Sequence, residues 1–295
     1  MAPPPPALPL AGEATDRLAG LDCIRAFRSL SFTLMIPADI DDGRRFIKRG
    51  NPAALPMFEA EAAGLAALRA SGTVRVPAVH ACEAQGGEAR IVLEYLDLRP
   101  LDRDSGTALG EALARLHRSS GPRFGWPTDN FIGATPQQNG WRDNWANFFA
   151  ERRLRPQLAL ARSNGMERKL AEQGESVAER IGAFFLDYRP AASLLHGDLW
   201  GGNAGALADG TPVIFDPACY YGDRETDLAM SELFGGFPDS FYAAYRRAWP
   251  LDSGYETRKT LYNLYHVLNH FNLFGAGYLG QARRMIERLL ADLRG

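Results

Sequence analysis

The chain has 295 residues, of which 46% are hydrophobic and 23% are charged, a composition typical of a folded globular protein. Its formal net charge of -2 gives no overall field that would attract nucleic acid or an anionic membrane, so we expect neither as a partner. Any phosphate chemistry must therefore come from a local site. A chain of this length is also near the size at which one core divides into two.

The cysteines and the hydropathy of the chain favour a cytoplasmic location. Cys23, Cys82 and Cys219 are odd in number and lack CxxC spacing, which predicts neither a disulfide framework nor a zinc cluster and favours a reducing compartment. The N-terminus has no basic segment before an apolar run, so a signal peptide is not expected. No stretch of about 18 apolar residues occurs, so no transmembrane helix is expected either.

The first third of the chain reads as a small β-rich region with one helix. Residues 1–14 are proline-rich and predict a flexible tail. Beyond this tail, β-prone runs at 31–36 and 45–48 flank the turn residues 41–43, a pattern typical of a hairpin. An alanine-rich helix is predicted over 57–70. Two further strands are predicted, over 76–82 and 90–95.

The remainder of the chain is predicted to be mainly helical. Apolar residues recur at helical spacing, as in the series Leu109, Leu113 and Leu116, and aromatic residues are frequent from Asp227 onwards. Further helices are predicted over 141–162 and 168–187, and two short apolar runs at 193–195 and 212–215 flank a glycine-rich loop. We therefore predict an α+β fold with two lobes, a β-rich lobe over 15–97 and a larger helical lobe over 98–295.

The glycine-rich loop at 196–203, with the sequence HGDLWGGN, carries the chemistry. Asp198 is followed five positions later by Asn203, which is the spacing of the catalytic loop of protein kinases, and Asp216 ends the next apolar run. Phosphoryl transfer from ATP needs a group that accepts the proton of the acceptor hydroxyl, and it needs oxygen ligands for magnesium. We therefore predict that Asp198 is the catalytic base and that Asn203 and Asp216 bind Mg²⁺.

Other residues of the same loop are given supporting roles. His196 is expected to hold the loop through backbone hydrogen bonds, and Gly201 and Gly202 are expected to allow a tight return of the chain. Trp200 is poorly explained by core packing, and we expect it to form a wall of the substrate site.

A kinase also needs a lysine on a strand to reach the α- and β-phosphates, and a glutamate on the next helix to hold that lysine. Lys48 ends an apolar strand, and the helix that follows carries Glu59 and Glu61. We prefer Glu61 because of its position relative to the buried stripe of that helix, and Glu59 is the second choice. The glycine-rich phosphate loop expected upstream is reduced to Gly20.

Motifs spread along the chain carry a resemblance to a known family. They lie at 57–61, 93–96, 124–126, 129–133, 196–200, 216–218, 220–225, 227–229, 233–236 and 261–266. With these segments the chain resembles the fructosamine kinase, or ketosamine-3-kinase, family, within the group of kinases similar to aminoglycoside phosphotransferases. The resemblance extends over nearly the whole chain, and the form DLWGGN of the catalytic loop is narrower than the general kinase pattern.

The resemblance implies a protein-kinase-like fold and ATP-dependent phosphorylation of the sugar 3-hydroxyl of ketosamines. These acceptors are ribulosamines, erythrulosamines or fructosamines, free or on protein lysines, and their phosphorylation serves deglycation. By matching position, Asp198 corresponds to the base, Asn203 and Asp216 to the magnesium ligands, and Lys48 to the phosphate-binding lysine. Glu94, Tyr95 and Leu96 correspond to the hinge that meets adenine through backbone groups.

The residues alone leave two alternatives open. A kinase of this kind could phosphorylate an aminoglycoside, choline or another small alcohol instead, although the aromatic rather than acidic C-terminal third counts against polycationic aminoglycosides. A kinase-like scaffold without activity is the other alternative, because Ala19, Leu21 and Asp22 interrupt the run of glycines that family members carry around Gly20. Both a monomer and a dimer are compatible with the sequence.

Several remaining features are interpreted as structural. His266 and His270 stand four positions apart on a predicted aromatic helix, and we expect packing rather than a metal site, since a metal hydrolase would lack its general base here. Asp227 is expected to cap the helix that begins at Leu228, and the charge cluster around it to support the active-site loop. Cys23 is interpreted as a free thiol rather than as half of an interchain disulfide.

Overall fold

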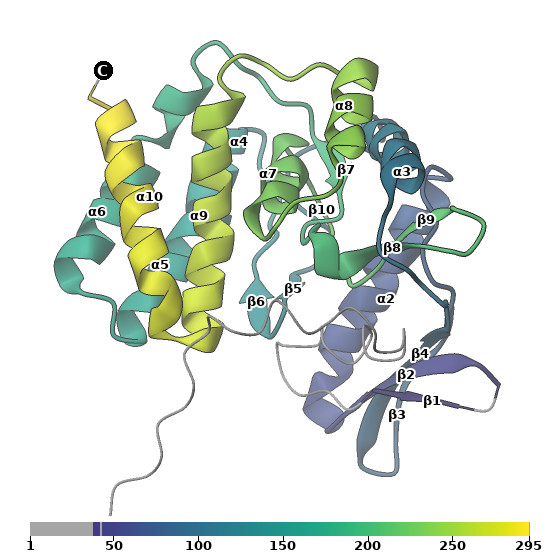
Figure 1. Ribbon diagram of the computed structural model, residues 1–295. Helices are drawn as coiled ribbons and strands as arrows, with labels where there is room; N and C mark the ends of the chain where they lie inside the picture. The colour runs from purple at the N-terminus through teal and green to yellow at the C-terminus, as the bar shows by residue number, and fades with distance from the viewer. Residues whose placement is uncertain (1–37, 42, 295) are drawn as a thin grey trace, which may run out of the picture.

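A computed structural model describes residues 38–41 and 43–294 of the chain. The predicted tail, the strand predicted over 31–36, Gly20 and Cys23 lie outside these residues. The described chain forms a small lobe built on a sheet, followed by a larger helical lobe (Figure 1), which is the α+β arrangement that the sequence predicts. The position of the lobe boundary, after residue 97, stays a prediction.

The small lobe contains a four-stranded antiparallel sheet in the order β1-β2-β4-β3. Its strands are β1 (Ala38–Ile40), β2 (Arg45–Gly50), β3 (Val79–Gln85) and β4 (Glu88–Glu94). β2 confirms the strand predicted over 45–48, and it pairs with β1 across the predicted turn. β3 begins three residues later than predicted, because Pro77 has no backbone N–H to donate and Arg75 pairs instead with Val213 of the helical lobe.

α2 (Leu55–Ala70) confirms the predicted alanine-rich helix and lies between the two lobes (Figure 1). Its buried apolar side chains join the core that the sheet shares with the helical lobe: Phe58, Leu65 and Leu68. At Gly64 the helix approaches the second lobe so closely that an added Cβ would lie 3.3 Å from the sulfur of Cys219. The helix therefore seats the small lobe directly on the larger one.

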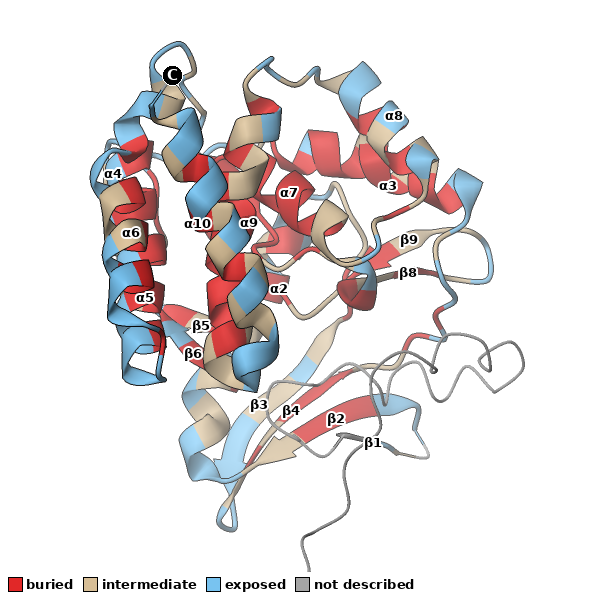
Figure 2. Ribbon diagram, turned by 60° about the vertical axis from the view of Figure 1, so that its left-hand side comes forward, coloured by how far each residue is buried: buried red, intermediate tan, exposed pale blue. Residues whose placement is uncertain are grey.

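The larger lobe is mainly helical, as predicted, and α9 (Tyr255–Phe274) is buried along most of its length (Figure 2). The helix predicted over 141–162 is divided, since it starts only at Trp145 under an Asn144 cap and contains a π-helical turn at Ala150–Leu154. The other helices are α3 (Arg103–Leu116), α4 (Trp145–Phe149), α5 (Arg155–Ser163), α6 (Arg168–Glu179), α7 (Glu225–Leu233), α8 (Asp239–Ala248) and α10 (Leu279–Asp292).

Three two-stranded antiparallel sheets lie where the lobes meet, and they position the loops of the site. β7 (Ser193–Leu195) pairs with β10 (Tyr220–Gly222), and β8 (Ala204–Ala206) pairs with β9 (Pro212–Ile214). The predicted catalytic loop therefore connects β7 to β8, and Asp216 lies in the connection from β9 to β10. The third sheet is the hairpin of β5 (Asn130–Ile132) and β6 (Thr135–Gln137).

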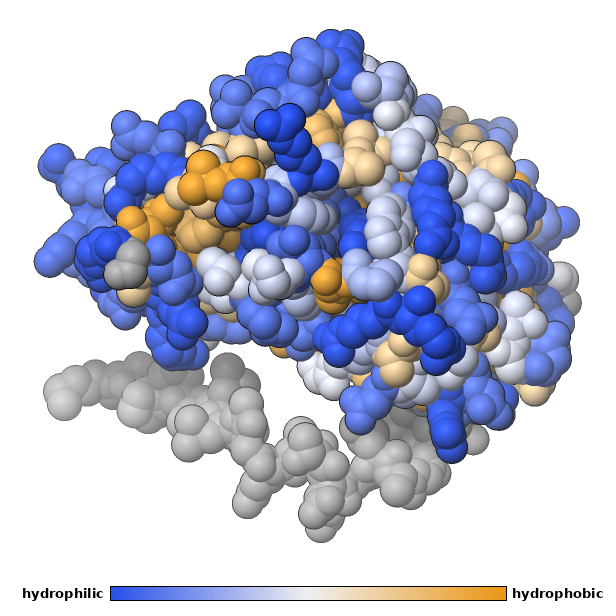
Figure 3. Space-filling view, turned by 90° about the horizontal axis from the view of Figure 1, so that it is seen from above, coloured by the Kyte–Doolittle hydropathy of each residue, from blue (hydrophilic) through white to orange (hydrophobic). Residues whose placement is uncertain are grey.

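The outer face of the helical lobe is largely hydrophilic, with hydrophobic residues gathered in small areas (Figure 3). Among the described residues the large hydrophobic side chains that are exposed are Ile40, Leu160, Leu186 and Phe274. No helix in the described part of the chain combines the length and the apolarity that crossing a bilayer requires.

Two glycines let α3 and α8 pack at very close range. A Cβ at Gly106 would lie 2.9 Å from the Ser240 hydroxyl, and a Cβ at Gly110 would overlap the backbone carbonyl oxygen of Phe241. The backbone of a helix cannot yield as a flexible side chain does. The two glycines, one turn apart on α3, therefore set the distance between these helices.

Replacing Gly110 by Ala is expected to destabilise the fold by about 1–3 kcal/mol, although alanine favours a helix more than glycine does. Gly280→Ala on α10 is the matched control, because a Cβ there meets only the end of the flexible Arg284 side chain, at 3.6 Å. It should raise the free energy of unfolding by about 0.5 kcal/mol. Urea unfolding measures both changes, and a stabilising Gly110→Ala would show that the helix contact is looser than described.

Candidate active site

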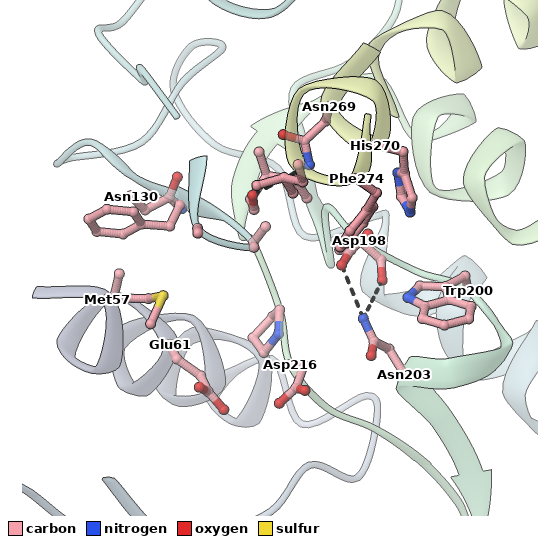
Figure 4. Close-up of a pocket in the computed structure, with 18 of the residues that line it drawn as sticks. Met57, Glu61, Asn130, Asp198, Trp200, Asn203, Asp216, Asn269, His270 and Phe274 are labelled. Atoms are coloured by element: carbon pink, nitrogen blue, oxygen red, sulfur yellow. Dashed lines mark hydrogen bonds between the residues drawn. The ribbon is translucent and has the colours of Figure 1, made fainter. Parts of the chain in front are cut away.

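Six of the predicted site residues come together around one cavity of about 520 Å³ between the lobes (Figure 4): Lys48, Glu61, Asp198, Trp200, Asn203 and Asp216. Lys48 and Glu61 reach it from β2 and α2, and Asp198, Asn203 and Asp216 reach it from the loops of the larger lobe. The remaining walls are formed by Met57, Phe58, Ala60, Asn130, Phe131, Ile132, Gly133, Ala134, Trp200, Pro217, Ala218, Phe234, Asn269, His270, Leu273, Phe274 and Tyr278.

Lys48 is held between two carboxylates at the base of the cavity. Its Nζ donates to the Glu61 Oε1 and Oε2 atoms at 2.9 and 3.0 Å and also contacts Asp216, whereas Glu59 is exposed on the other side of α2. Burial alone would lower the pKa of Lys48, but the charges of Asp216 and Glu61 outweigh burial and raise it above its ordinary value. Lys48 therefore stays cationic although its side chain is only 7% exposed.

The two carboxylates respond differently to their surroundings. Burial raises the pKa of Glu61 to about 7, against the opposing charge of Lys48. Burial also acts to raise the pKa of Asp216, but the charge of Lys48 prevails and lowers it. Asp216 is thus the principal counter-ion of the lysine.

Asp198 and Asn203 form the pair that the spacing of the loop predicts. The Asn203 Nδ2 atom donates to the Asp198 backbone carbonyl at 2.9 Å and to its Oδ2 at 3.2 Å. Burial and the nearby charge of Asp216 raise the pKa of Asp198 to about 7, and the hydrogen bond from Asn203 partly opposes this rise. In Figure 4 the amide oxygen of Asn203 is turned toward Asp216, away from Asp198.

Two backbone conformations shape these loops. Gly197 has φ +85°, and a Cβ there would overlap the Ala218 carbonyl oxygen, so only glycine fits. Asp216 has φ +56°, a left-handed conformation that is uncommon for a residue with a side chain. Gly201 and Gly202 form a 3₁₀ turn that returns the chain to Asn203, as expected, and neither has a positive φ. The left-handed residue lies one position before Asp198 instead.

Asp227, in α7, holds the catalytic loop through hydrogen bonds to its backbone. Its Oδ2 and Oδ1 atoms accept from the backbone N–H groups of His196 and Gly197, both at 2.8 Å, and its Oδ2 also contacts the His117 Nε2 atom at 3.1 Å. The prediction that Asp227 caps a helix starting at Leu228 is wrong, because α7 begins three residues earlier, at Glu225, and the Asp227 carboxylate binds the loop instead. Of the charge cluster that was expected to support the loop, Asp227 gives this support directly.

His196 holds the loop through backbone bonds, as expected. Its Nε2 atom lies 2.9 Å from the carbonyl oxygen of Phe215, and its own carbonyl accepts from the Ala218 N–H at 2.8 Å. Burial lowers the pKa of His196, so the ring is neutral and serves as a structural bridge between the two active-site loops.

The β5–β6 hairpin is attached to the loop after Asp216 by side-chain amides. Asn130 donates to the Cys219 carbonyl at 2.8 Å, and Gln137 donates to the Ala218 carbonyl at 3.3 Å. Both amides are buried. The hairpin therefore forms one side of the cavity in fixed register with the residues that carry Asp216.

A fully buried arginine supports the hairpin from behind. Arg153, in the π-helical turn, donates to the Asn139 Oδ1 atom at 2.7 Å and to the Gln138 carbonyl at 2.6 Å. Its guanidinium lies 4.0 Å from the ring centroid of Tyr220 and 4.7 Å from that of Phe148. Among the described residues it forms no ion pair, so these groups stabilise its charge.

Trp200 faces the cavity, where it belongs to an aromatic wall. Its ring lies at 6.0 Å from that of Phe234, which lies at 4.8 Å from His270, and His270 also contacts Phe274 and Tyr278. His270 donates from Nδ1 to the His266 carbonyl at 2.8 Å, which fixes its tautomer, and burial lowers its pKa. The pair at 266 and 270 thus packs as expected, and His270 is in addition part of the cavity wall.

The segment predicted to meet adenine ends β4. The backbone N–H groups of Glu94 and Tyr95 donate to the carbonyls of Ala78 and Arg44 at 2.8 and 3.2 Å. The side chain of Leu96 is buried. Of the described residues that line the cavity, none belongs to this segment. Its contact with adenine stays a prediction, as does any role of Gly20.

The hairpin and the polar residues of α9 belong to the site but are not among the predicted site residues. Asn130, Asn269 and His270 line the cavity although no motif of phosphoryl transfer includes them. The sequence does hold one signal for α9. Asn269 and His270 come directly after a run of buried residues in this helix, and a buried amide needs a hydrogen-bond partner or a function.

Comparison with known proteins places this site in a family. A sequence profile described as fructosamine kinase matches residues 32–292. The chain belongs to the fructosamine kinase family. A relative from Synechocystis sp., named as a probable ketoamine kinase, is 49% identical over 83% of this chain and 82% of its own. The protein-ribulosamine 3-kinase of Arabidopsis thaliana is 41% identical over 86% of this chain and 78% of its own.

Solved structures agree with this family and with the fold. The crystal structure of a protein from Haemophilus somnus 129PT, assigned to the fructosamine-3-kinases, superposes with a TM-score of 0.78 at 32% identity, covering 83% of each chain. The choline kinase LicA of Streptococcus pneumoniae superposes with a TM-score of 0.54 at 15% identity, over 84% of this chain and 86% of its own. The protein-kinase-like fold predicted from the sequence is confirmed.

Replacing Asp198 by Asn is expected to stabilise the fold at alkaline pH. The pKa of this carboxyl is about 7 in the folded protein, against about 3.9 for an exposed aspartate. Its contribution to stability is therefore present below about pH 4 and is lost as the pH rises through 7. The variant should exceed the wild type by about 1–3 kcal/mol in free energy of unfolding at pH 8, and the difference should shrink towards pH 4.

Urea unfolding in EDTA at a series of pH values measures this difference. Asp97→Asn is the control, because Asp97 is exposed and a surface change of this kind stays within about 0.5 kcal/mol. A difference between Asp198→Asn and wild type that does not change with pH would contradict the raised pKa.

Proposed function

We propose that this protein is an ATP-dependent kinase that phosphorylates the 3-hydroxyl of ketosamines. The observation that carries the proposal is the convergence of Lys48, Asp198, Asn203 and Asp216 on one cavity with an aromatic far wall. The Arabidopsis relative is named for its acceptor class, a ribulosamine on protein, and for the position phosphorylated. Family membership supports the use of ATP.

The residues at the base of the cavity fit a nucleotide triphosphate with Mg²⁺. Magnesium takes a few hard oxygen ligands from protein and completes its shell with phosphate oxygens and water. The Asp216 carboxylate and the Asn203 amide oxygen supply two such donors, since the hydrogen bonds from its Nδ2 turn the Asn203 oxygen away from Asp198. Bound metal would neutralise charge on the transferring phosphate. Lys48, held by Glu61, is the cation for the other phosphates.

Asp198 is the group that receives the proton of the acceptor hydroxyl. Its raised pKa makes it a stronger base than an exposed aspartate, and Asn203 holds its Oδ2 while the second oxygen remains available. The hydroxyl is held against this oxygen in line with the transferring phosphate, so orientation supplies part of the rate enhancement. Asp227 contributes indirectly, because it holds the backbone N–H groups of His196 and Gly197, just before Asp198.

The wall opposite the phosphate end favours a sugar amine with an organic substituent. Trp200, Phe234, Phe274 and Tyr278 present aromatic surface, and the carboxylates of the cavity lie on the phosphate side. Sugar rings or chains pack on aromatic faces, and a protonated secondary amine gains from the same faces by cation–π attraction. A polycationic aminoglycoside would need acidic residues on this wall. We place the reaction in the cytoplasm, on free or protein-bound adducts.

ADP release by the purified chain with Mg-ATP tests the proposal. The acceptors are matched free and protein-bound ribulosamines and fructosamines, with choline and kanamycin as alternative acceptors. Turnover is expected with at least one ketosamine and not with choline or kanamycin. Turnover with kanamycin or choline alone would overturn the acceptor assignment, and no binding of Mg-ATP by calorimetry would favour the inactive scaffold.

The variant Asp198→Asn is expected to lower kcat on the ketosamine by about 10²- to 10⁴-fold, the usual range for loss of a general base. Its affinity for Mg-ATP should change by no more than about threefold, because Asn203 and Asp216 remain. The matched control is Asp97→Asn, which removes an exposed carboxyl outside the cavity. Loss of nucleotide affinity equal to the loss of kcat would assign Asp198 to metal binding instead.

A further inference from the structure

A chain of four side-chain amides runs from the surface of the helical lobe to the cavity. Asn164 donates from Nδ2 to the Asn272 Oδ1 atom at 3.2 Å, and Asn272 donates from Nδ2 to the Gln157 Oε1 atom at 2.7 Å. Gln157 then donates from Nε2 to the Asn269 Oδ1 atom at 3.1 Å. Every link runs in the same direction, with nitrogen donating towards the cavity.

The direction of the chain fixes the orientation of Asn269. Its carbonyl oxygen is occupied by Gln157, whose own oxygen is occupied by Asn272, so a flipped amide would set two nitrogens or two oxygens against each other. Amides linked in this way also polarise one another, which strengthens the last donor. Asn269 therefore presents N–H groups, and not an acceptor, at the end of the chain.

The terminal amide of this chain is buried but poorly satisfied. Asn269 is only 3% exposed and lines the cavity, and Figure 4 shows its nitrogen turned toward the cavity interior. Among the described residues, the hydrogen-bond partner of its Nδ2 atom is the Ile132 carbonyl at 3.5 Å, which is at the limit of hydrogen-bonding distance. A buried amide donor with so long a bond is costly unless another acceptor reaches it.

We propose that Asn269 is a specificity-determining residue that donates a hydrogen bond to the keto oxygen of the acceptor. This inference rests on the proposed function, because the keto group of a ketosamine is on C2, next to the C3 hydroxyl that faces Asp198. A ketone oxygen has no hydrogen and only accepts, so it matches a site whose orientation permits donation alone. A sugar amine that lacks the oxygen on C2 leaves this donor without a partner.

The choice of partner follows from the other groups of the cavity. Asp198 is an acceptor and suits the hydroxyl that loses its proton, whereas Lys48 is already held by Glu61 and Asp216. Asn269 lies on α9, across the cavity from Lys48 and Asp216 and next to the aromatic wall. We place the 3-hydroxyl of the ketosamine at Asp198 and its amine substituent on the aromatic wall. C2 then lies between Asp198 and this wall, near Asn269.

The test pairs two enzymes with two acceptors. The acceptors are an N-alkyl ribulosamine and the matched 1-alkylamino-1,2-dideoxypentitol, which keeps the 3-hydroxyl and lacks the oxygen on C2. For the wild type, kcat/KM for the ribulosamine should exceed that for the deoxy compound by about 10- to 100-fold, the usual effect of leaving a buried donor unpaired. In Asn269→Ala this preference should fall to within about threefold, with the KM for ATP changed by less than about threefold.

A merely structural role of Asn269 would lower kcat/KM for both acceptors and leave the preference as it is, which would overturn the proposal. Asn269→Asp keeps the shape and loses the N–H donors, so it should lose the preference as well and serves as the second variant if Asn269→Ala does not fold. Asn147→Ala is the matched control, because Asn147 is exposed on α4, and it should keep the wild-type preference.

The outcomes separate this proposal from the proposed function. If the wild type phosphorylates neither these two acceptors nor any other ketosamine, the proposed function is overturned, and the role of Asn269 with it. Phosphorylation of both acceptors by the wild type at similar kcat/KM would leave the kinase function in place and overturn the role of Asn269 alone.

Discussion

The carboxylate of Asp227 is the contact on which the site depends most. It accepts hydrogen bonds from the backbone N–H groups of His196 and Gly197, the two residues before Asp198, and it does so while almost fully buried. Charge-assisted bonds of this kind are short and directional, and they hold a loop that has little regular structure of its own. On its other side the loop packs so closely that a Cβ at Gly197 would overlap the Ala218 carbonyl oxygen.

The site also brings three carboxyl groups close together, and the single charge of Lys48 can neutralise only one of them. Lys48 balances Asp216, whereas Glu61 and Asp198 keep pKa values of about 7, so some of the acid stays protonated near neutrality. Such an arrangement is costly for folding and suits a site that must receive cations and a proton. The neutral, aromatic wall beyond it forms the opposite end of the same cavity.

Sequence reasoning recovers the parts of the site that depend on local spacing. The pairing of Asp198 with Asn203 follows from five positions along one loop, and the preference for Glu61 over Glu59 follows from the direction of one helix; the structure brings these residues together. Asp227 was interpreted as a helix cap because a carboxylate before an apolar run usually is one. Its actual partners lie about 30 positions away, where no local pattern reaches.

The hairpin and the amide chain were missed for the same physical reason. The hydrogen-bond partners that fix Asn130, Gln157 and Asn269 are more than 80 residues away in sequence. The sequence around an Asn or Gln does not indicate which distant partner its side chain will bind. The composition of α9 shows that polar residues accompany a buried stripe, but not what they bind. The contacts with nucleotide that fall on Gly20 and on residues 94–96 remain predictions.

The close seat of α2 on the second lobe has a consequence for how the protein unfolds. Gly64 brings the helix that carries Glu61 against Pro217 and Cys219, in the same loop as Asp216, and Lys48 joins both sides by ion pairs. Separation of the two lobes would therefore expose apolar surface on both and would break the buried ion pairs of Lys48. The two lobes should lose their structure in one cooperative transition, with no intermediate in which the sheet alone has melted.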